Sequence, residues 1–275
     1  MENLPAAKTL GPVSARVINT LIEHGKDIFM LNDACEIYGR GKQETTQFLR
    51  DLVDRGILAR LKSGVFLILK TGQENTQLSN WPILARMLAG ADKYYISHYS
   101  AMRLQGMTTH PLTTVTITLP KKRRPKKIQD FIYQFIYTKP NHFWGLSEYW
   151  VTRQEKVYVS DLERTILDGL DRPDLCGGIK EIIRGIWSKQ KQIDWGKLAD
   201  DAKRYHNKAT IKRLGFVLEI LNLGETCLPL LKNMIMMRKD YILLDPNGSK
   251  FGKYVSHWRL QLNMNIDELK ASVWG

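Results

Sequence analysis

The sequence predicts an α+β fold in two domains, with a small domain over residues 1–72 and a larger one over residues 73–275. Three observations lead to this prediction. The first seventy residues combine short helical patterns with two strand-like runs. A polar, aperiodic stretch at 71–80 (TGQENTQLSN) is then typical of a linker. Beyond it, strand patterns mix with capped helices, and the pattern becomes mostly helical after residue 178.

The small domain begins with a helix over residues 12–23, which has an apolar stripe at every third or fourth position. A short second helix follows Asn32, which we expect to be its N-cap, and ends before Gly39. A third helix runs from about 42 to 55 and stops at a glycine. The apolar residues that mark the first and third helices are Val13, Val17, Leu21, Phe48, Leu49, Leu52 and Val53.

Two strand-like runs follow directly, at 57–61 and 65–69, and Lys62-Ser63-Gly64 separates them as a hairpin turn. Two short helices joined by a tight glycine-containing turn form a helix-turn-helix unit. A hairpin placed directly after its second helix is a wing. The small domain is therefore predicted to be a winged helix-turn-helix.

In such a unit the second helix usually enters the major groove of DNA by its N-terminal end. Gln and Arg there can make bidentate contacts to base edges, whereas Lys and Thr suit phosphates. The expected contacts to double-stranded DNA are Lys42, Gln43, Thr45, Thr46, Gln47 and Arg50 in the helix, and Arg60, Lys62 and Ser63 in the hairpin. A protein-interaction module remains an alternative, since acidic residues keep the net charge of this region low.

The large domain is predicted to be a mixed α/β domain with a helical C-terminal part. A capping box of Ser160 and Glu163 is expected to open one helix, and the strand at 131–137 is expected to be central because it is apolar on both faces. The other predicted strands are 94–96, 114–119, 157–159, 241–244 and 258–262, and the predicted helices are 83–89, 97–105, 161–170, 179–186, 198–205, 211–221 and 228–237.

A dense basic run lies between the strands at 114–119 and 131–137. We expect it to be a solvated loop held open by its own repulsion, and an additional nucleic-acid contact is left open. Its members are Lys121, Lys122, Arg123, Arg124, Lys126 and Lys127.

The overall charge also points to a polyanionic partner. The chain has 41 Lys and Arg against 28 Asp and Glu, a net charge of +13. Cys35, Cys176 and Cys227 lie far apart, so the sequence suggests neither a metal site nor a disulfide framework. With no apolar stretch long enough for a membrane span, a cytoplasmic protein without membrane contact is expected.

The common catalytic motifs are absent from the sequence. It contains no phosphate-binding loop, no GxGxxG, no GxSxG and no HExxH, so we expect neither a cofactor nor an enzyme. One trace is similar to restriction-type nucleases: Asp245, followed by Glu268 and Lys270 in an E-x-K spacing. In those enzymes the E-x-K lies on a strand, whereas here the segment after Asn265 has a helical pattern.

Several segments together resemble the AbiEi family of abortive-infection antitoxins. They are 56–66 (GILARLKSGVF), 95–107 (YISHYSAMRLQGM), 159–168 (VSDLERTILD), 171–173 (DRP) and 177–178 (GG). The Glu-Arg-Thr-x-Leu-Asp block within 159–168 is the most specific of them. The resemblance covers residues from about 15 to 190, and the C-terminal third does not match motif by motif.

The resemblance implies a bifunctional protein of a type IV toxin-antitoxin system. Its winged helix would bind inverted repeats in its own promoter and repress an operon shared with a nucleotidyltransferase-like toxin. The larger domain would neutralise that toxin, usually without a tight complex. An alternative is a ligand-responsive repressor, which requires a concave apolar pocket in the large domain.

Six residues of these motifs stand out, and for them a fold-defining role is favoured over a toxin-facing one. They are Ser97, Ser100, Glu163, Arg164, Thr165 and Asp168. Arg164 and Asp168 are spaced as an i, i+4 pair, which by itself can stabilise a helix.

Overall fold

The computed structural model describes residues 10–69, 81–90, 93–128, 131–152, 155–235 and 240–273, and the protein is a mixture of helices and sheets, as the sequence predicts. The chain divides into two compact units, residues 1–88 and 89–275. The stretch at 71–80, predicted to be a linker, lies outside the described residues. Because α4 (Trp81–Ala89) falls almost entirely in the first unit, the division comes later than residue 72.

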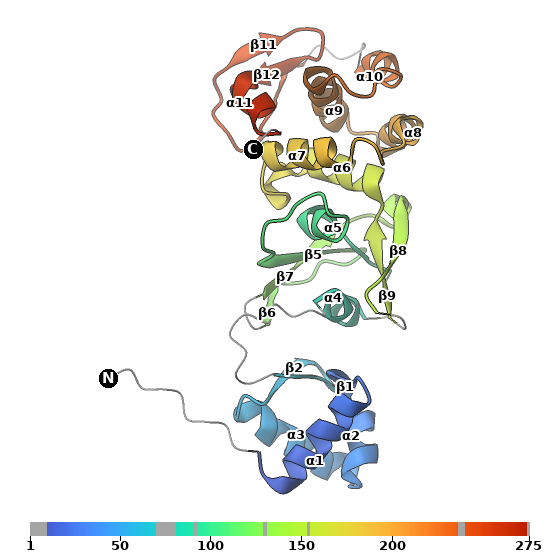
Figure 1. Ribbon diagram of the computed structural model, residues 1–275, viewed down its shortest axis with the longest axis vertical. Helices are drawn as coiled ribbons and strands as arrows, with labels where there is room; N and C mark the ends of the chain where they lie inside the picture. Colours follow the sequence, from blue (N-terminus) through green and yellow to red (C-terminus); the bar gives the residue numbers. More distant parts are fainter. Residues whose placement is uncertain are drawn as a thin grey trace, which may run out of the picture. The chain divides into compact units, whose positions relative to one another are not determined.

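The first unit joins helices to a small antiparallel sheet of strand order β1-β3-β2 (Figure 1). Its elements before α4 are α1 (Pro12–Glu23), β1 (Ile28–Met30), α2 (Leu31–Tyr38), α3 (Lys42–Asp54), β2 (Leu58–Lys62) and β3 (Val65–Ile68). The predicted helices and the hairpin are thus present. The strand β1 was not predicted, because three residues leading into a helix carry no strand pattern of their own.

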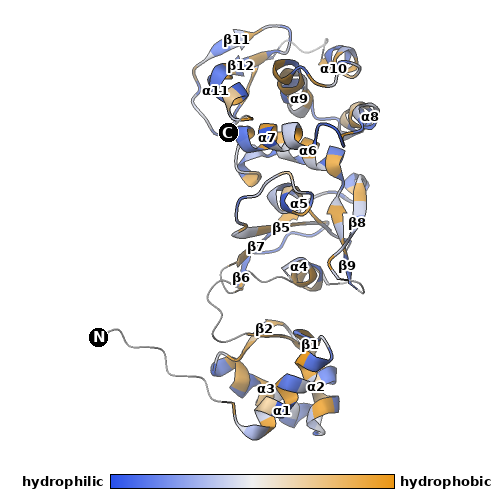
Figure 2. Cartoon of the chain, viewed as in Figure 1, coloured by the Kyte–Doolittle hydropathy of each residue, from blue (hydrophilic) through white to orange (hydrophobic). Residues whose placement is uncertain are grey.

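Apolar side chains from both the helices and the sheet form the core of this unit. Figure 2 shows hydrophobic and hydrophilic residues alternating along its helices, as expected where one face of each helix is buried. The buried core residues are Val17, Ile18, Leu21, Phe29, Ala34, Leu49, Leu52, Ile57, Leu58, Phe66 and Ile68.

The connection between α2 and α3 is tight because Gly39 takes a left-handed conformation, with φ of 71°. The start of α2 differs from the prediction. The helix begins at Leu31 with Met30 as its N-cap residue, so Asn32 is not the cap. Instead, the carboxylate of Asp33 accepts a hydrogen bond of 2.7 Å from the backbone N–H of Met30.

The second unit is built on a six-stranded sheet of order β6-β7-β5-β4-β9-β8. Its strands are β4 (Tyr95–Ile96), β5 (Thr114–Leu119), β6 (Lys126–Ile128), β7 (Phe131–Tyr137), β8 (Leu146–Trp150) and β9 (Lys156–Ser160). As predicted, β7 is an interior strand, between β6 and β5. It is not buried on both faces, however, because Ile132 is 44% exposed.

The helix α5 (His98–Leu104) packs against β5, and α6 (Leu162–Asp171) packs against α5 in turn (Figure 1). The predicted capping box at the start of α6 is wrong. Ser160 still belongs to β9, and Asp161 is the N-cap, accepting a hydrogen bond of 2.9 Å from the N–H of Arg164.

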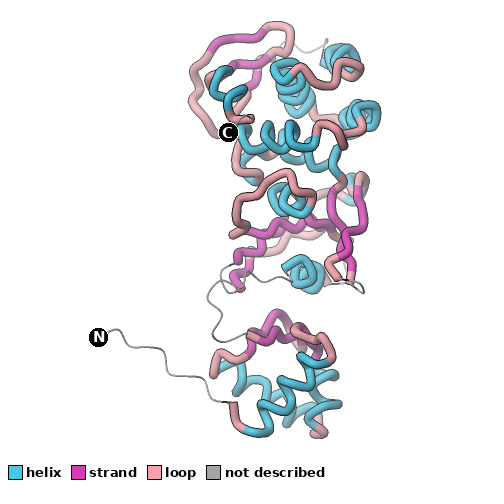
Figure 3. Tube along the Cα trace, in the orientation of Figure 1, coloured by secondary structure: helices cyan, strands magenta, loops and turns pink. Residues whose placement is uncertain are grey.

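The helical C-terminal part is present, and in Figure 3 most of its helices gather on one side of the large sheet. Its elements are α7 (Ile179–Lys189), α8 (Trp195–Tyr205), α9 (Lys208–Leu221), α10 (Leu228–Ile235), β10 (Ile242–Leu243), β11 (Lys253–Val255), β12 (Leu260–Leu262) and α11 (Ile266–Ala271). The strands β10, β12 and β11 form a small mixed sheet. Within the described part of the chain, none of the helices combines the length and the apolar character of a membrane span.

Candidate nucleic-acid interface

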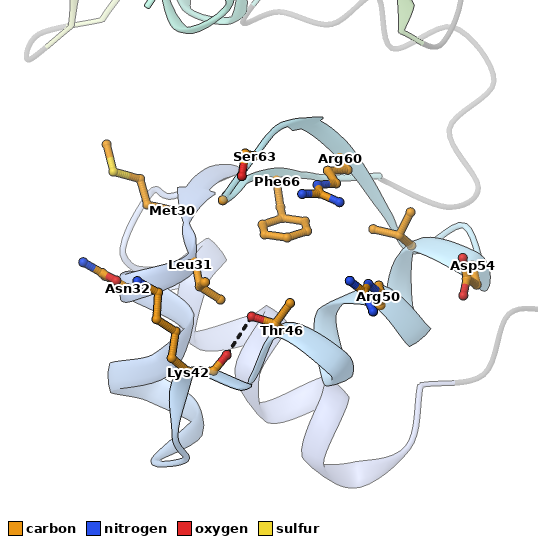
Figure 4. Close-up of a pocket in the computed structure, with 12 residues that line it drawn as sticks. Met30, Leu31, Asn32, Lys42, Thr46, Arg50, Asp54, Arg60, Ser63 and Phe66 are labelled. Carbon is orange, nitrogen blue, oxygen red and sulfur yellow. Dashed lines mark hydrogen bonds between the residues drawn. The ribbon is translucent and has the colours of Figure 1, made fainter. Parts of the chain in front are cut away.

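A concave groove lies on the first unit, between α3, the start of α2 and the β2–β3 hairpin (Figure 4). It has a volume of about 590 Å³. In Figure 4, Arg50 extends into it from α3 and Arg60 from the hairpin, and the ring of Phe66 lies beside Arg60. The lining residues are Met30, Leu31, Asn32, Lys42, Thr46, Arg50, Val53, Asp54, Arg60, Ser63, Gly64 and Phe66.

The groove is electropositive. Lys42, Arg50 and Arg60 are all exposed, and none of them forms an ion pair with another described residue. Asp54 is the one acidic residue in the lining. Exposed cations without an internal partner are available to phosphate groups, and a concave surface brings several of them to one ligand.

The side of α3 that faces solvent adjoins this groove and forms a shallower hollow of about 260 Å³. It is lined by Lys42, Gln43, Thr46, Gln47 and Arg50, five of the six helix residues predicted to contact DNA. The amide of Gln47 donates a hydrogen bond of 2.9 Å to Asp51, which orients it along the helix. Gln43 has no such partner among the described residues, so its amide is available for a ligand.

The sixth helix residue, Thr45, was wrongly predicted to contact DNA. Its side chain is fully buried, and its hydroxyl donates to the carbonyl oxygens of Gly41 and Arg40, at 3.0 and 3.3 Å. In the hairpin, Ser63 is exposed at the rim of the groove. The side chain of Lys62 lies outside the described part of the structure.

Two residues at the start of α2 were missed by sequence reasoning. Met30 is 57% exposed and lines the groove beside Asn32. Since Asp33 satisfies the backbone at this helix start, the amide of Asn32 is not occupied by capping. The hairpin turn lies close to this helix start, because the N–H of Leu31 donates to the carbonyl of Gly64 at 2.8 Å.

The basic run in the second unit is a loop only in part. Lys121, Lys122 and Arg124 are exposed before β6, as expected. Arg123 is half-buried, and its guanidinium donates to the carbonyl of Ala89 at 3.1 Å. Lys126 and Lys127, predicted to lie in the loop, belong to the edge strand β6, which pairs with β7.

The residues of the Glu-Arg-Thr-x-Leu-Asp block are buried inside the second unit. Arg164 is 2% exposed and donates a hydrogen bond of 2.8 Å to Asp168. It also donates to the carbonyls of His142 and Trp144 and to the Tyr95 hydroxyl. The rings of Trp144, Tyr205 and Tyr95 surround the guanidinium, with centroids 4.3, 5.0 and 5.7 Å away.

This arrangement keeps Arg164 charged. Burial is the largest single effect and lowers the pKa of the guanidinium. The charge of Asp168, its hydrogen bond to Arg164 and the nearby Tyr95 and Tyr205 together outweigh burial, so the pKa is raised overall. The partner Asp168 also accepts from the Tyr205 hydroxyl at 3.1 Å, while its other carboxylate oxygen is buried without a partner in the described structure. Arg164 thereby ties the sheet to α6 and α8.

The other motif residues have internal partners as well. Ser97 and Ser100 are fully buried and bond to threonines of β5 at 2.8 Å. Thr165 shares a hydrogen bond of 2.8 Å with Ser160. Glu163 accepts from the N–H of Asp194 and pairs with Lys197 at 3.1 Å. Burial with satisfied partners is what a fold-defining role requires.

The nuclease-like trace lies on a helix, as its sequence pattern predicts. Glu268 and Lys270 belong to α11, and Glu268 forms an exposed ion pair of 2.8 Å with Lys180. The Asp245 carboxylate accepts from the backbone N–H of Asn247. Among the described residues, no group of three or more His, Cys, Asp or Glu side chains is placed to hold a metal ion.

A solved protein structure has a fold similar to that of this chain. The crystal structure of the Rv2827c protein from Mycobacterium tuberculosis is similar to this chain, with a TM-score of 0.70. The match covers 98% of this chain and 97% of that chain, at 13% sequence identity. The two chains share a fold. No family model matches the sequence, and no curated protein does.

Proposed function

We propose that this protein is a DNA-binding autorepressor and antitoxin, whose first unit is a winged helix-turn-helix. The observation that carries the DNA-binding half is the groove. It gathers Lys42, Arg50 and Arg60 from α3 and the hairpin, and none of the three has an ion-pair partner among the described residues. Such a surface suits the phosphate backbone of DNA.

In this proposal, α3 enters the major groove with the exposed side that carries Lys42, Gln43 and Arg50. Gln43 and Arg50 then read base edges, because a free amide matches adenine and a guanidinium matches guanine. Lys42 binds a phosphate, and Arg60 reaches the flanking backbone from the hairpin. Asn32, at the start of α2, extends the contact on the other side of the groove.

The antitoxin half rests on the resemblance of residues 15–190 to the AbiEi family. The proposed partner is a nucleotidyltransferase-like toxin encoded in the same operon. Because Arg164, Asp168 and the other motif residues are buried, we assign them to the fold rather than to toxin contact. The toxin is then engaged, directly or indirectly, through residues outside the motifs, and the protein needs no catalytic centre of its own.

A mobility shift with the chain's own upstream DNA tests the DNA-binding half. We expect specific binding, and we expect Arg50→Ala and Gln43→Ala each to weaken it by about 1–3 kcal/mol through lost base contacts. Arg16→Ala is the matched control. Arg16 is an exposed arginine on α1 that lines neither hollow, so its loss should change affinity only through net charge. Equal losses in Arg50→Ala and Arg16→Ala would contradict the assigned groove.

A salt series on the same DNA tests the basic run. If Lys121, Lys122 and Arg124 also bind phosphates, neutralising all three should make the salt dependence of the binding constant shallower, by roughly 0.9 in logarithmic slope per lost contact. An unchanged slope would restrict the interface to the first unit.

Toxin protection is tested by co-expressing the chain with the nucleotidyltransferase-like protein of the neighbouring reading frame. Wild type should restore growth, and Arg50→Ala should restore growth equally while losing repression of a promoter reporter. Loss of both activities in folded Arg50→Ala would show that the two roles are not separable. Failure of wild type to protect would refute the antitoxin half and leave the repressor half standing.

A further inference from the structure

The large sheet of the second unit has two edges that differ in how they are protected. One edge is β6, a three-residue strand that carries Lys126 and Lys127 and follows Pro125. The other edge is β8, with five residues, LSEYW, and neither proline, glycine nor lysine among them. Short length, lysines and proline are what soluble proteins use to block pairing at a sheet edge. By this measure β6 is blocked and β8 is open.

The pairing with β9 determines which backbone groups of β8 point outward. Asp161 donates to the carbonyl of Gly145, and Val151 donates to the carbonyl of Glu155, at 2.9 and 2.8 Å. In an antiparallel ladder the bonded positions alternate, so the odd-numbered residues of β8 bond to β9. Leu146, Glu148 and Trp150 therefore turn their N–H and C=O groups away from the sheet. No backbone hydrogen bond joins these groups to another described segment.

Exposed aromatic side chains flank the same edge. Trp150 is 59% exposed, and Tyr158 and Tyr149 are 47% and 37% exposed. Tyr149 lies on one face of the sheet and the other two on the opposite face, as the strand alternation requires. Exposed tyrosine and tryptophan beside unpaired backbone groups are typical of protein interfaces.

We propose that β8 pairs in an antiparallel manner with β8 of a second copy of this chain, which continues the sheet across a two-fold axis. The outward positions are symmetric about Glu148. A two-fold axis at Glu148 therefore sets Leu146 opposite the partner's Trp150 and brings every outward N–H to an outward carbonyl. Both of those apolar side chains lie on the same face. Since β6 is blocked, the pairing closes as a dimer and cannot grow into a fibre.

The edge formed by β8 carries less of the chain's positive charge than the net charge would suggest. The chain has a net charge of +13, so two copies repel each other overall. At this edge the charges balance, because Glu148 forms an ion pair of 2.7 Å with Lys156. Lys156 in turn lies 5.5 Å from the centroid of the Trp150 ring. Across the two-fold axis, however, Glu148 lies opposite the partner's Glu148, and the repulsion between these two carboxylates weakens the pairing.

Dimerisation through β8 does not depend on the proposed DNA-binding and antitoxin functions, but it is compatible with them. An operator made of inverted repeats is bound by two copies related by a two-fold axis. A weak dimer through β8 would hold two copies together for such a site.

Sedimentation equilibrium of the full-length chain over a range of concentrations tests the proposal. We expect wild type to shift from monomer to dimer as concentration rises. Glu148→Pro should raise the dissociation constant at least about tenfold, because it removes a central inter-chain donor. Proline is tolerated there, since this N–H does not bond to β9. Glu148→Gln is the matched control, and it should dimerise as tightly as wild type or more tightly.

Wild type that stays monomeric up to its solubility limit overturns the proposal and leaves the edge to an extended segment of another protein. Glu148→Pro that dimerises as wild type does, while unfolding at the same temperature, also overturns it. Binding to a duplex with a single half-site is measured in parallel. If wild type does not bind this duplex, the DNA-binding half of the proposed function is refuted, whereas the sedimentation result is unaffected.

Discussion

Replacing Arg164 by methionine tests whether the buried motif holds the second unit together. The substitution keeps an apolar stem of similar length but removes the charge that faces Asp168 at 2.8 Å, where both side chains are 3% exposed. Breaking a buried ion pair from one side costs about 3–5 kcal/mol, because the remaining charge is left without a partner. The carbonyls of His142 and Trp144 also lose their donor.

That loss is large beside the stability of an ordinary domain, about 5–15 kcal/mol. We therefore expect Arg164→Met to be marginally folded in its second unit. Adding Asp168→Leu should recover at least about 2 kcal/mol, since replacing both members of a buried pair by apolar side chains is often close to neutral.

Urea unfolding followed by tryptophan fluorescence measures the effect, because every tryptophan except Trp81 belongs to the second unit. Arg172→Met is the matched control. Arg172 pairs with Asp174 at 2.7 Å, but these side chains are 50% and 36% exposed. Its loss should cost less than about 1 kcal/mol. If Arg164→Met costs no more than Arg172→Met, the central role given to Arg164 is wrong.

Three further predictions concern single sites. A Cβ atom at Gly215 would stand 2.0 Å from the fully buried ring of Trp258, so Gly215→Ala should destabilise the C-terminal part by about 3 kcal/mol or more, measured by thermal unfolding. Burial lowers the pKa of His98 below 6.5, although the charge of Asp168 opposes this shift. Below about pH 6.5 the histidine is therefore protonated in the unfolded chain but not in the folded chain. Stability should fall as the pH drops from about 7 to 5.5, and less steeply in His98→Asn, which suits the positive φ at this position; equal slopes would refute this. Thr45→Val should leave DNA affinity unchanged and lower stability by about 1 kcal/mol, and a loss of affinity in a stable variant would return Thr45 to the interface.

The elements of the first unit are predictable from the sequence because each has a local cause. The apolar stripe of α3 and the glycines beside it define a helix of the right length. The burial of Thr45 also has a local cause, since this residue lies four positions before Leu49 and seven before Leu52, on the same buried face. At this position the place on the helix, and not the polar residue type, determines burial.

Other features depend on contacts between distant parts of the chain and carry no local signal. Lys126 and Lys127 form a strand because β7 is beside them, although their own sequence has the charge of a loop. The cap of α6 is Asp161 rather than Ser160 because β9 continues through Ser160, and the S-x-x-E spacing cannot indicate where a strand stops. The groove likewise needs the hairpin turn to lie beside the start of α2, which is a tertiary contact.

The Glu-Arg-Thr-x-Leu-Asp block, the most specific sequence pattern of the second unit, lies in the interior of that unit. Its residues are therefore poor candidates for contact with a partner. Glu163, Arg164, Thr165 and Asp168 bond to other parts of the same unit, so another protein with this interior can have a different surface. Residues that bind a partner must instead be exposed and unpaired within the chain. In the described structure, the cations of the groove and the outward backbone groups of β8 meet that condition, and the motif does not.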